Sequence, residues 1–394
     1  MRPARIAIAG GSIGGLTAAC LLRDAGHDVT VFERSSTELE QRGAGIGLLE
    51  ASSRYLTERA GIGIDQISIA TDLIRYLGRS GRVVHQQAHR YRFSSWNTVY
   101  RRLLGAFGRE RYRLGHEVAS WALARDSVVV HFADGASIGA DLLVCADGVG
   151  SSARARLQPD ASASYAGYVA WRGMVPEGEL APALADRLGR AITYHVLANS
   201  HILVYPIPGL DGSVVPGERL INFVWYRNYL EGEELDELLI DRDGQSRQLS
   251  VPPGKVADHH RDEVRATAAA RLPADVAEVV LKTSALFLQV VYDIEVERMA
   301  FDRVCLIGDA ACVARPHAAA GTAKAAEDGW ALAAALAQAD SIEQALAAWE
   351  PRQVKLGRTL VERARRIGRR SQVDNAWVPG DPELLFGLHT AGER

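Results

Sequence analysis

The chain has 394 residues, a length that allows two packed domains. Hydrophobic residues make up 47% and charged residues 24% of the sequence, which is the balance of a soluble globular protein rather than of a disordered chain. The formal net charge of −3 argues against nucleic acid as a partner, and the absence of any run of about 18 apolar residues argues against a membrane span.

The first predicted element, residues 5–34, reads as a strand, a glycine-rich turn, a helix and a second strand. Its first apolar run is too short for a signal peptide, so we expect a cytoplasmic protein. Dinucleotide-binding turns need glycine where the chain turns, where the backbone approaches the pyrophosphate, and where the helix packs on the strand. Gly10 and Gly15 fit the outer positions, while Ser12, followed by Ile13, stands at the middle one. The alternative is an ordinary glycine-rich turn.

Glu33 closes the second strand of this unit, where its carboxylate can accept hydrogen bonds from ribose hydroxyls, and Arg34 follows it. A chance acid at a strand end is the alternative. A second glycine cluster, residues 42–50, adds Gly45 and Ile46 as candidates.

An amphipathic helix is predicted over residues 97–108, and a hairpin turning at Asp134-Gly135 is predicted after it. Asp147-Gly148 differs from that turn, because no pairing strand follows it. With Arg154 it can form a phosphate-bracing loop. The alternative is a plain turn followed by a helix that Ser151 or Ser152 caps.

Short β-like runs with many tryptophans and tyrosines fill residues 165–290, which predicts a mainly antiparallel sheet domain with some helices. The α/β pattern then returns. A strand runs into Gly308-Asp309, and an alanine-rich helix opens at Gly321. The positive end of such a helix suits an anion. A basic helix over residues 342–370 follows, with Pro351 expected to interrupt it.

The four cysteines, Cys20, Cys145, Cys305 and Cys312, contain no CxxC pair. They are predicted to be reduced core thiols rather than a disulfide framework or a zinc site, and we predict no metal site.

These three motifs, around Gly10, Asp147 and Asp309, occur in the order that is typical of one family, and together they resemble the FAD-dependent aromatic monooxygenases of the para-hydroxybenzoate hydroxylase type. The resemblance covers nearly the whole chain. It implies an α/β (overall α+β) fold with a Rossmann-like FAD-binding domain, a second, mainly antiparallel sheet domain for the substrate, and a C-terminal helical segment. The expected FAD-binding domain is discontinuous (1–75, 96–164 and 286–350), the substrate-binding domain comprises 76–95 and 165–285, and a C-terminal helix and tail follows at 351–394.

The resemblance also implies which residues bind FAD. The implied set is Gly10, Ser12, Ile13, Gly15, Glu33, Arg34, Gly45, Ile46, Arg101 (with Arg102 as the alternative), Asp147, Gly148, Arg154, Gly308, Asp309, Ala319, Gly321 and Thr322. Three positions depart from the family pattern: Ser12 and Ala319 replace glycines, and Cys312 stands where many members have histidine.

The implied activity is hydroxylation of an electron-rich hydroxylated aromatic or N-heteroaromatic ring, dihydroxypyridine-like or phenolic, through a flavin C4a-hydroperoxide. NADH or NADPH supplies electrons, and O2 is the co-substrate. His317 is the candidate for a catalytic polar contact or proton relay, because its loop borders the expected flavin site. The candidate substrate-binding residues are Tyr168, Trp171, His201, Tyr205, Trp225 and Pro316, with core packing as the alternative for each aromatic.

Other functions fit the same FAD module. A flavin-dependent halogenase would need a tunnel lysine, for which Lys324 is the one candidate near the flavin loop, and it would need a W-x-W-x-I-P segment, which is absent from the sequence. An isoprenoid reductase and a non-catalytic carrier also fit this module. The sequence leaves the oligomeric state open, with a homodimer as one candidate.

Overall fold

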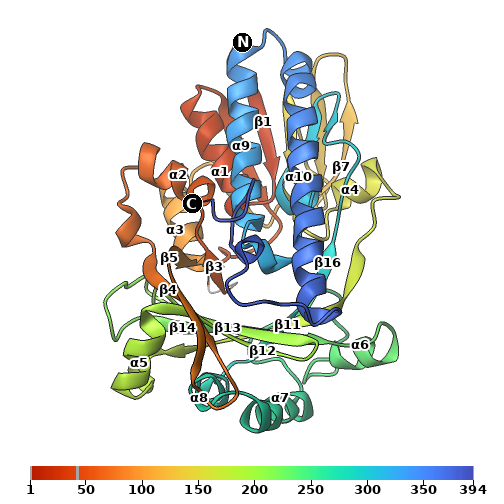
Figure 1. Cartoon of the computed structure of the whole chain (residues 1–394). Helices are drawn as coiled ribbons and strands as arrows, with labels where there is room; N and C mark the ends of the chain where they lie inside the picture. Colours follow the sequence, from red (N-terminus) through yellow and green to blue (C-terminus); the bar gives the residue numbers. More distant parts are fainter. Residues whose placement is uncertain (1, 41–43, 394) are drawn as a thin grey trace.

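The computed structural model describes residues 2–40 and 44–393, which form a six-stranded, a nine-stranded and a three-stranded sheet with helices around them. Figure 1 shows the six-stranded sheet toward one end of the molecule and the nine-stranded sheet at the other. Helices α9 (Gly321–Gln338) and α10 (Ile342–Gln372) lie beside the first, and α10 reaches the second (Figure 1). This arrangement confirms the predicted fold class, with two sheet layers and a C-terminal helical segment. No helix among the described residues is long and apolar enough to cross a membrane.

The six-stranded sheet has the order β17-β18-β10-β1-β2-β6, and all of its pairs are parallel except β17 with β18. Its strands are β1 (Arg5–Ala9), β2 (Asp28–Glu33), β6 (Tyr112–Leu114), β10 (Leu142–Cys145), β17 (Ala300–Phe301) and β18 (Val304–Leu306). Helix α1 (Ile13–Asp24) joins β1 to β2, which confirms the predicted strand, turn, helix and strand. Gly26, with φ of 90°, follows the last helical turn because a side chain is strained in that conformation.

The three-stranded sheet consists of β7 (Val118–Leu123), β8 (Val128–Phe132) and β9 (Ser137–Ala140). The hairpin of β8 and β9 turns at Asp134-Gly135 as predicted, and Gly135 has φ of 88°.

The nine-stranded sheet has the order β15-β16-β11-β14-β13-β12-β4-β5-β3, and its neighbours are antiparallel except β12 with β4. Its strands are β3 (Gly45–Gly47), β4 (Ile69–Leu77), β5 (Val83–Ser95), β11 (Ser164–Pro176), β12 (Ala191–Leu197), β13 (Ser200–Ile207), β14 (Leu220–Asn228), β15 (Ser250–Val251) and β16 (Phe287–Asp293). The predicted antiparallel sheet over residues 165–290 is therefore present, and it is extended by strands from the first hundred residues.

Side chains on this sheet alternate between two faces, as the period of a strand requires. On β11, Trp171 packs into the core between the sheet and the helices beneath it, whereas Tyr168 and Ala170 belong to the core on the opposite face. The helices beneath the sheet include α7 and α8 (Figure 1). The opposite face looks toward α10 and the C-terminal residues.

The remaining helices have the following bounds: α2 (Glu50–Arg54), which continues as the π-helical turn η1 (Tyr55–Arg59), α3 (Trp96–Phe107), α4 (Ser152–Leu157), α5 (Pro182–Gly189), α6 (Glu233–Leu238), α7 (Asp258–Arg271) and α8 (Ala274–Lys282). Short 3₁₀ turns are η2 (Ile64–Gln66), η3 (Glu177–Glu179), η4 (Gly308–Ala310), η5 (Pro316–Ala318) and η6 (Pro382–Leu384). Helix α3 confirms the helix predicted at 97–108.

Helix α10 corrects one prediction, because Pro351 lies inside a continuous helix of 31 residues and does not interrupt it. A proline inside a helix removes one backbone hydrogen bond and costs about 3 kcal/mol. The helix buries Ala345, Leu346 and Trp349 before that residue and Leu360 and Val361 after it. Tertiary packing on both sides therefore outweighs the local penalty.

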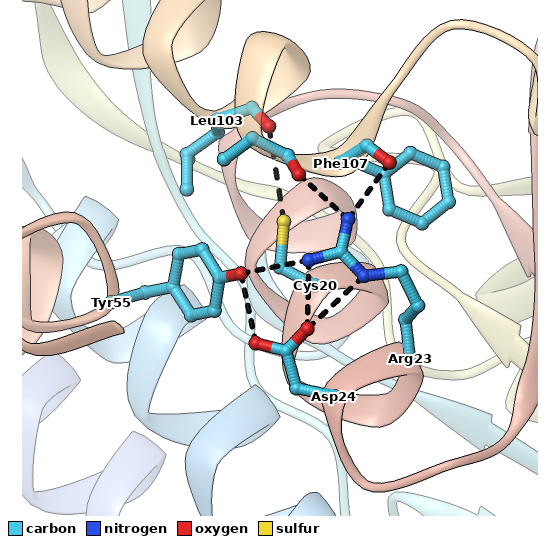
Figure 2. Close-up of polar contacts among 7 residues, drawn as sticks. Cys20, Arg23, Asp24, Tyr55, Leu103 and Phe107 are labelled. Carbon is cyan, nitrogen blue, oxygen red and sulfur yellow. Dashed lines mark hydrogen bonds and ion pairs between the residues drawn. The ribbon is translucent and has the colours of Figure 1, made fainter. Parts of the chain in front are cut away.

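A network of hydrogen bonds connects α1 to α3 and η1 (Figure 2). Arg23 Nη1 donates to the last carbonyls of α3, at 2.6 Å from Ala106 O and 2.8 Å from Phe107 O. Its Nη2 contacts Asp24 at 2.7 Å and the Tyr55 hydroxyl at 3.0 Å, and that hydroxyl donates to Asp24 at 2.9 Å. Arg23 thus satisfies carbonyls at the helix end that have no partner within the helix. The four cysteines are free and buried, as predicted, and burial raises the pKa of the Cys20 thiol to about 12.

Candidate active site

One cavity of about 350 Å³ lies between the glycine turn after β1 and the nine-stranded sheet; we call it the central cavity. Among the residues predicted to bind cofactor, those that line it are Ser12, Ile13, Gly15, Gly45, Ile46, Gly148, Gly308, Asp309, Ala319, Gly321 and Thr322. Among those predicted to contact substrate, His201, Tyr205, Pro316 and His317 line it. The chain therefore brings segments that are far apart in sequence to a single hollow.

The turn after β1 needs glycine at both outer positions. A Cβ on Gly10, which has φ of 102°, would lie 2.3 Å from the Ala146 carbonyl oxygen, and a Cβ on Gly15 would lie 2.0 Å from the Gly10 carbonyl oxygen. Both positions are thus closed to any side chain. Gly10 does not line the central cavity, so its role in the structure is to let β1, α1 and the loop after β10 pack together.

Glu33 is buried at the end of β2, and both of its carboxylate oxygens accept backbone hydrogen bonds. Oε2 accepts from Gly11 N at 2.9 Å, and Oε1 accepts from Ser35 N at 2.9 Å. Glu33 therefore braces the glycine turn from behind and does not line the central cavity, and the exposed Arg34 lies outside it as well.

The Asp147-Gly148 loop leads into α4, and Ser151 caps that helix by accepting from Arg154 N at 2.9 Å. Asp147 accepts from Ser151 Oγ at 2.6 Å. Arg154 is buried and donates to backbone carbonyls, with 3.1 Å to Ala310 O and 3.3 Å to Asp309 O. Arg154 thus ties this loop to the Gly308-Asp309 turn, and burial lowers its pKa. Asp147 and Arg154 do not line the central cavity.

Asp309 follows β18 and is exposed to the central cavity, where its carboxylate accepts no hydrogen bond from the described residues. Protein surrounds it on its other sides, and this burial raises its pKa, although Lys324 and Arg154 act in the opposite direction. Beneath the turn, Lys324 Nζ and Asp328 Oδ2 form a buried ion pair of 2.7 Å, and the same oxygen accepts from Gly308 N at 2.8 Å. The ion pair holds the backbone that presents Asp309.

The loop before α9 brings backbone close to the cavity. Ala319 has φ of 52°, the left-handed conformation in which glycine is usual. A Cβ on Gly47 would lie only 2.8 Å from the Ala319 Cβ, so β3 and this loop are in close contact. No side chain caps α9, and Gly321 and Thr322 line the cavity at its first turn.

Gly45 on β3 is hydrogen-bonded to side chains of two other strands of the nine-stranded sheet, β13 and β14. Its N–H donates to Asn222 Oδ1 at 3.1 Å, and its carbonyl accepts from the Tyr205 hydroxyl at 3.0 Å. Residues 42 and 43 of the predicted glycine cluster lie outside the described residues. Arg101 lies outside the central cavity and forms an ion pair of 3.2 Å with Glu40.

His317 lies at the centre of an aromatic group on the substrate side. Its Nε2 is 2.7 Å from the Tyr168 hydroxyl, its ring centroid is 4.6 Å from that of Tyr226 and 5.4 Å from that of His201, and its buried Nδ1 has no partner. Burial lowers the pKa of His317 well below its ordinary value and that of His201 to about 3. Both histidines are therefore neutral at pH 7. Tyr168 is buried behind His317 and does not line the cavity.

Trp171 and Trp225 lie opposite one another on β11 and β14 and face away from the central cavity. Their indole N–H groups donate to Tyr229 Oη at 3.1 Å and Ser200 Oγ at 2.9 Å. This corrects the prediction that they line the substrate site. The reason is strand alternation, which places their neighbours in sequence on the cavity face.

Sequence reasoning missed many of the side chains that line the cavity, among them Arg172, Tyr194, Tyr226, Gln289, Trp377 and Phe386. Residues an even number of positions apart on a strand share a face of the sheet. On β11, Arg172 therefore lies on the same face as Tyr168, and on β14, Tyr226 lies on the same face as Val224. Trp377 stacks on His201 with ring centroids 4.5 Å apart, and Phe386 stacks on Tyr91 at 4.5 Å. These two come from the segment after α10, and no local pattern in the sequence places that segment at the site.

The residues of the central cavity fit FAD. Asp309 offers a carboxylate without a partner among the described residues to polyol hydroxyls, the open start of α9 offers N–H groups, and His317 Nδ1 is a buried polar atom without a partner. Lys324, the lysine that a halogenase would require, is buried in its ion pair with Asp328 and does not line the cavity.

Comparisons with known proteins agree with this geometry. Family models described as an NAD(P)-binding Rossmann-like domain, an FAD binding domain-like domain and an FAD binding domain match residues 8–37, 165–293 and 239–364. The chain is 37% identical over 390 residues to the 2,6-dihydroxypyridine 3-monooxygenase of Paenarthrobacter nicotinovorans, with 99% of this chain and 97% of the relative covered.

Two solved structures are also similar. The 2,6-dihydroxypyridine-3-hydroxylase of Arthrobacter nicotinovorans superposes with a TM-score of 0.92 at 36% identity, covering 98% of each chain. Klebsiella pneumoniae HpxO, complexed with FAD and uric acid, shares the fold, with a TM-score of 0.76 at 24% identity and coverage of 96% and 90%.

The chain belongs to the family of FAD-dependent aromatic monooxygenases. FAD is its cofactor, and the monooxygenase reaction uses a nicotinamide donor and O2. The family resemblance that the three ordered motifs predicted is confirmed, and the similar proteins include a bacterial 2,6-dihydroxypyridine 3-hydroxylase.

Proposed function

We propose that this enzyme hydroxylates a small hydroxylated N-heteroaromatic ring, with 2,6-dihydroxypyridine as the first candidate. The observation that carries the proposal is the pairing of a flavin-type cofactor wall with a small cavity that is lined by aromatic rings and neutral histidines. The similar curated protein and the similar solved structure both bear names with this substrate.

Each predicted cofactor-binding element has a proposed role. Ser12, Ile13 and Gly15 would hold the pyrophosphate, Asp309 would accept hydrogen bonds from ribitol hydroxyls, and the N–H groups of the first turn of α9 would stabilise negative charge on the bound cofactor. When bound, FAD supplies the redox chemistry, taking electrons from the nicotinamide and activating O2. Glu33 and Arg154 shape the backbone around it, through their hydrogen bonds to Gly11 N and Ala310 O.

The substrate side holds the ring and keeps water out. Trp377 and Phe386 line the cavity beside the sheet, where their rings would keep water away from the reacting atoms. His317, neutral and bonded to Tyr168, can accept a proton from a substrate hydroxyl or donate a hydrogen bond to it. No charged nucleophile is required of the protein.

We further propose the division into a discontinuous FAD-binding domain, a substrate-binding domain and a C-terminal segment, with β3 and the start of β4 contributed to the nine-stranded sheet by the first segment. NADH as the donor and a cytoplasmic location belong to the same proposal.

Oxidation of NADH by the FAD-loaded enzyme tests the substrate. We expect 2,6-dihydroxypyridine to accelerate NADH oxidation by about tenfold or more and to gain one oxygen atom in the product, read by mass spectrometry with ¹⁸O₂. A phenol panel serves as the comparison. Stimulation and oxygen incorporation by a phenol alone, with neither from any hydroxypyridine, would overturn the proposal.

A further inference from the structure

Arg172 lies on the cavity face of the sheet, and none of the described carboxylates forms an ion pair with it. It lies on β11 opposite Val224 of β14, which also lines the central cavity. The ion pairs among the described residues do not include Arg172, whereas Arg315, which stacks on the Tyr168 ring of the same strand, is paired with Asp293 at 2.8 Å. The Arg172 Nε atom is buried and has no hydrogen-bond partner.

The groups that face Arg172 are neutral. Burial raises the pKa of Tyr205 to about 12 and also raises that of Tyr226, while the positive charge of Arg172 acts to lower both. His201 and His317 line the same cavity and are neutral, because burial lowers the pKa of each. The titratable groups on which the charge of Arg172 acts are thus two tyrosine hydroxyls.

Asp309 is the other charged residue among the described ones that line the cavity, and it lies in a different electrostatic environment. The charges that act on its carboxyl are those of Lys324, Arg154 and Asp328. The charge of Arg172 is not among those that act on Asp309, so the Asp309 carboxylate does not neutralise Arg172. A charge held in such a place without a partner is unfavourable until an anion binds.

We propose that Arg172 binds an anionic oxygen atom of the substrate, and this inference rests on the proposed function. The planar guanidinium presents parallel N–H donors that suit a deprotonated ring hydroxyl or a carboxylate. Tyr226 and Gln289 stand on the same face and can supply neutral hydrogen bonds to the rest of the ring. An ion pair with Arg172 lowers the pKa of a bound hydroxyl, so the substrate is held in its ionised, electron-rich form.

The test measures binding without turnover, by the change in flavin absorbance of the FAD-loaded enzyme. The probes are 2,6-dihydroxypyridine, its non-ionisable analogue 2,6-dimethoxypyridine, and nicotinate, whose anionic group is a carboxylate. We expect R172Q to weaken binding of at least one anionic probe by about tenfold or more, and R172K by about threefold, with a change below about twofold for dimethoxypyridine. A loss confined to dihydroxypyridine identifies a ring oxygen as the anion, and a loss confined to nicotinate identifies a carboxylate.

The matched control is R190Q, because the Arg190 side chain is 71% exposed and does not line the central cavity. Equal losses for all three probes, or unchanged affinity for both anions, would overturn the proposal. If R172Q does not retain FAD, the same measurements are made with R172K.

Thiocyanate separates the two proposals. One outcome supports the anion site and rejects the proposed substrate. In it, none of the three pyridine probes binds, but thiocyanate changes the flavin spectrum of the unchanged enzyme and leaves that of R172Q unchanged.

Discussion

The two ends of the central cavity are built from different parts of the chain. The cofactor end is made of backbone and small residues, in which Gly15 and Gly47 leave less than 3 Å for any added Cβ. The substrate end is made of side chains such as Arg172, His201 and Tyr226. They share one face of the nine-stranded sheet, because side chains alternate between the two faces along each strand. The cofactor end therefore depends on the absence of side chains, and the substrate end depends on their chemistry.

Adding a single methyl group at the cofactor end should have the largest effect. In G15A the new Cβ would lie 2.0 Å from the Gly10 carbonyl oxygen, so the turn must shift and stability falls by about 3 kcal/mol or more. The measurement is the FAD content of purified protein together with its melting temperature. G105A is the control, because Gly105 lies in α3 with no atom near its Cβ, and it should gain about 0.5–1 kcal/mol. Equal behaviour of the two variants would contradict the contrast.

Breaking the ion pair beneath Asp309 should come next. K324M leaves the Asp328 carboxylate buried without its partner, which costs about 3–5 kcal/mol, and it loosens the turn through Gly308 N. Denaturant unfolding and the dissociation constant of FAD measure the two effects. K282M removes an exposed pair with Glu278 and should change stability by less than about 1 kcal/mol. If the FAD affinity of K324M is unchanged, the ion pair does not support cofactor binding.

At the substrate end, lowering the pH should reduce the stability of the folded protein through the two buried histidines. Their pKa values are lowered in the folded protein, so below about pH 6.5 the unfolded chain binds protons that the native protein does not. Stability is complete above that pH and falls as the pH decreases, by up to about 1.4 kcal/mol per pH unit for each histidine. Melting temperatures from pH 7.5 to 5 measure the slope, and H201Q should flatten it. The same slope in H201Q would mean that other groups cause it.

The smallest effect should separate two neighbours on β14. Y226F removes a hydroxyl that lines the central cavity and should raise KM for the substrate by about three- to tenfold, the equivalent of one hydrogen bond. W225F changes the opposite face, where the indole contacts Ser200, and should affect stability but leave KM within about twofold. Reversed results would mean that the two faces of the sheet are misassigned.

The class of enzyme and the turns of the cofactor end could be read from the sequence alone. The glycine turn, the Asp147-Gly148 loop and the Gly308-Asp309 turn are local structures, and their residues must occur at fixed spacing for the backbone to form them. Even so, the contacts differ from the pattern, since Glu33 and Arg154 hold backbone in place and do not line the cavity.

The side chains of the substrate end could not be read from the sequence, because their positions depend on the fold. Strand alternation turned Trp171 and Trp225 away and Arg172 and Tyr226 inward, and the registers that fix this choice join strands far apart in the chain. Trp377 reaches the site because α10 continues through Pro351, which packing sustains against the local preference. Side chains that recognise a ligand are selected by long-range contacts, and long-range contacts have no local signature in a sequence.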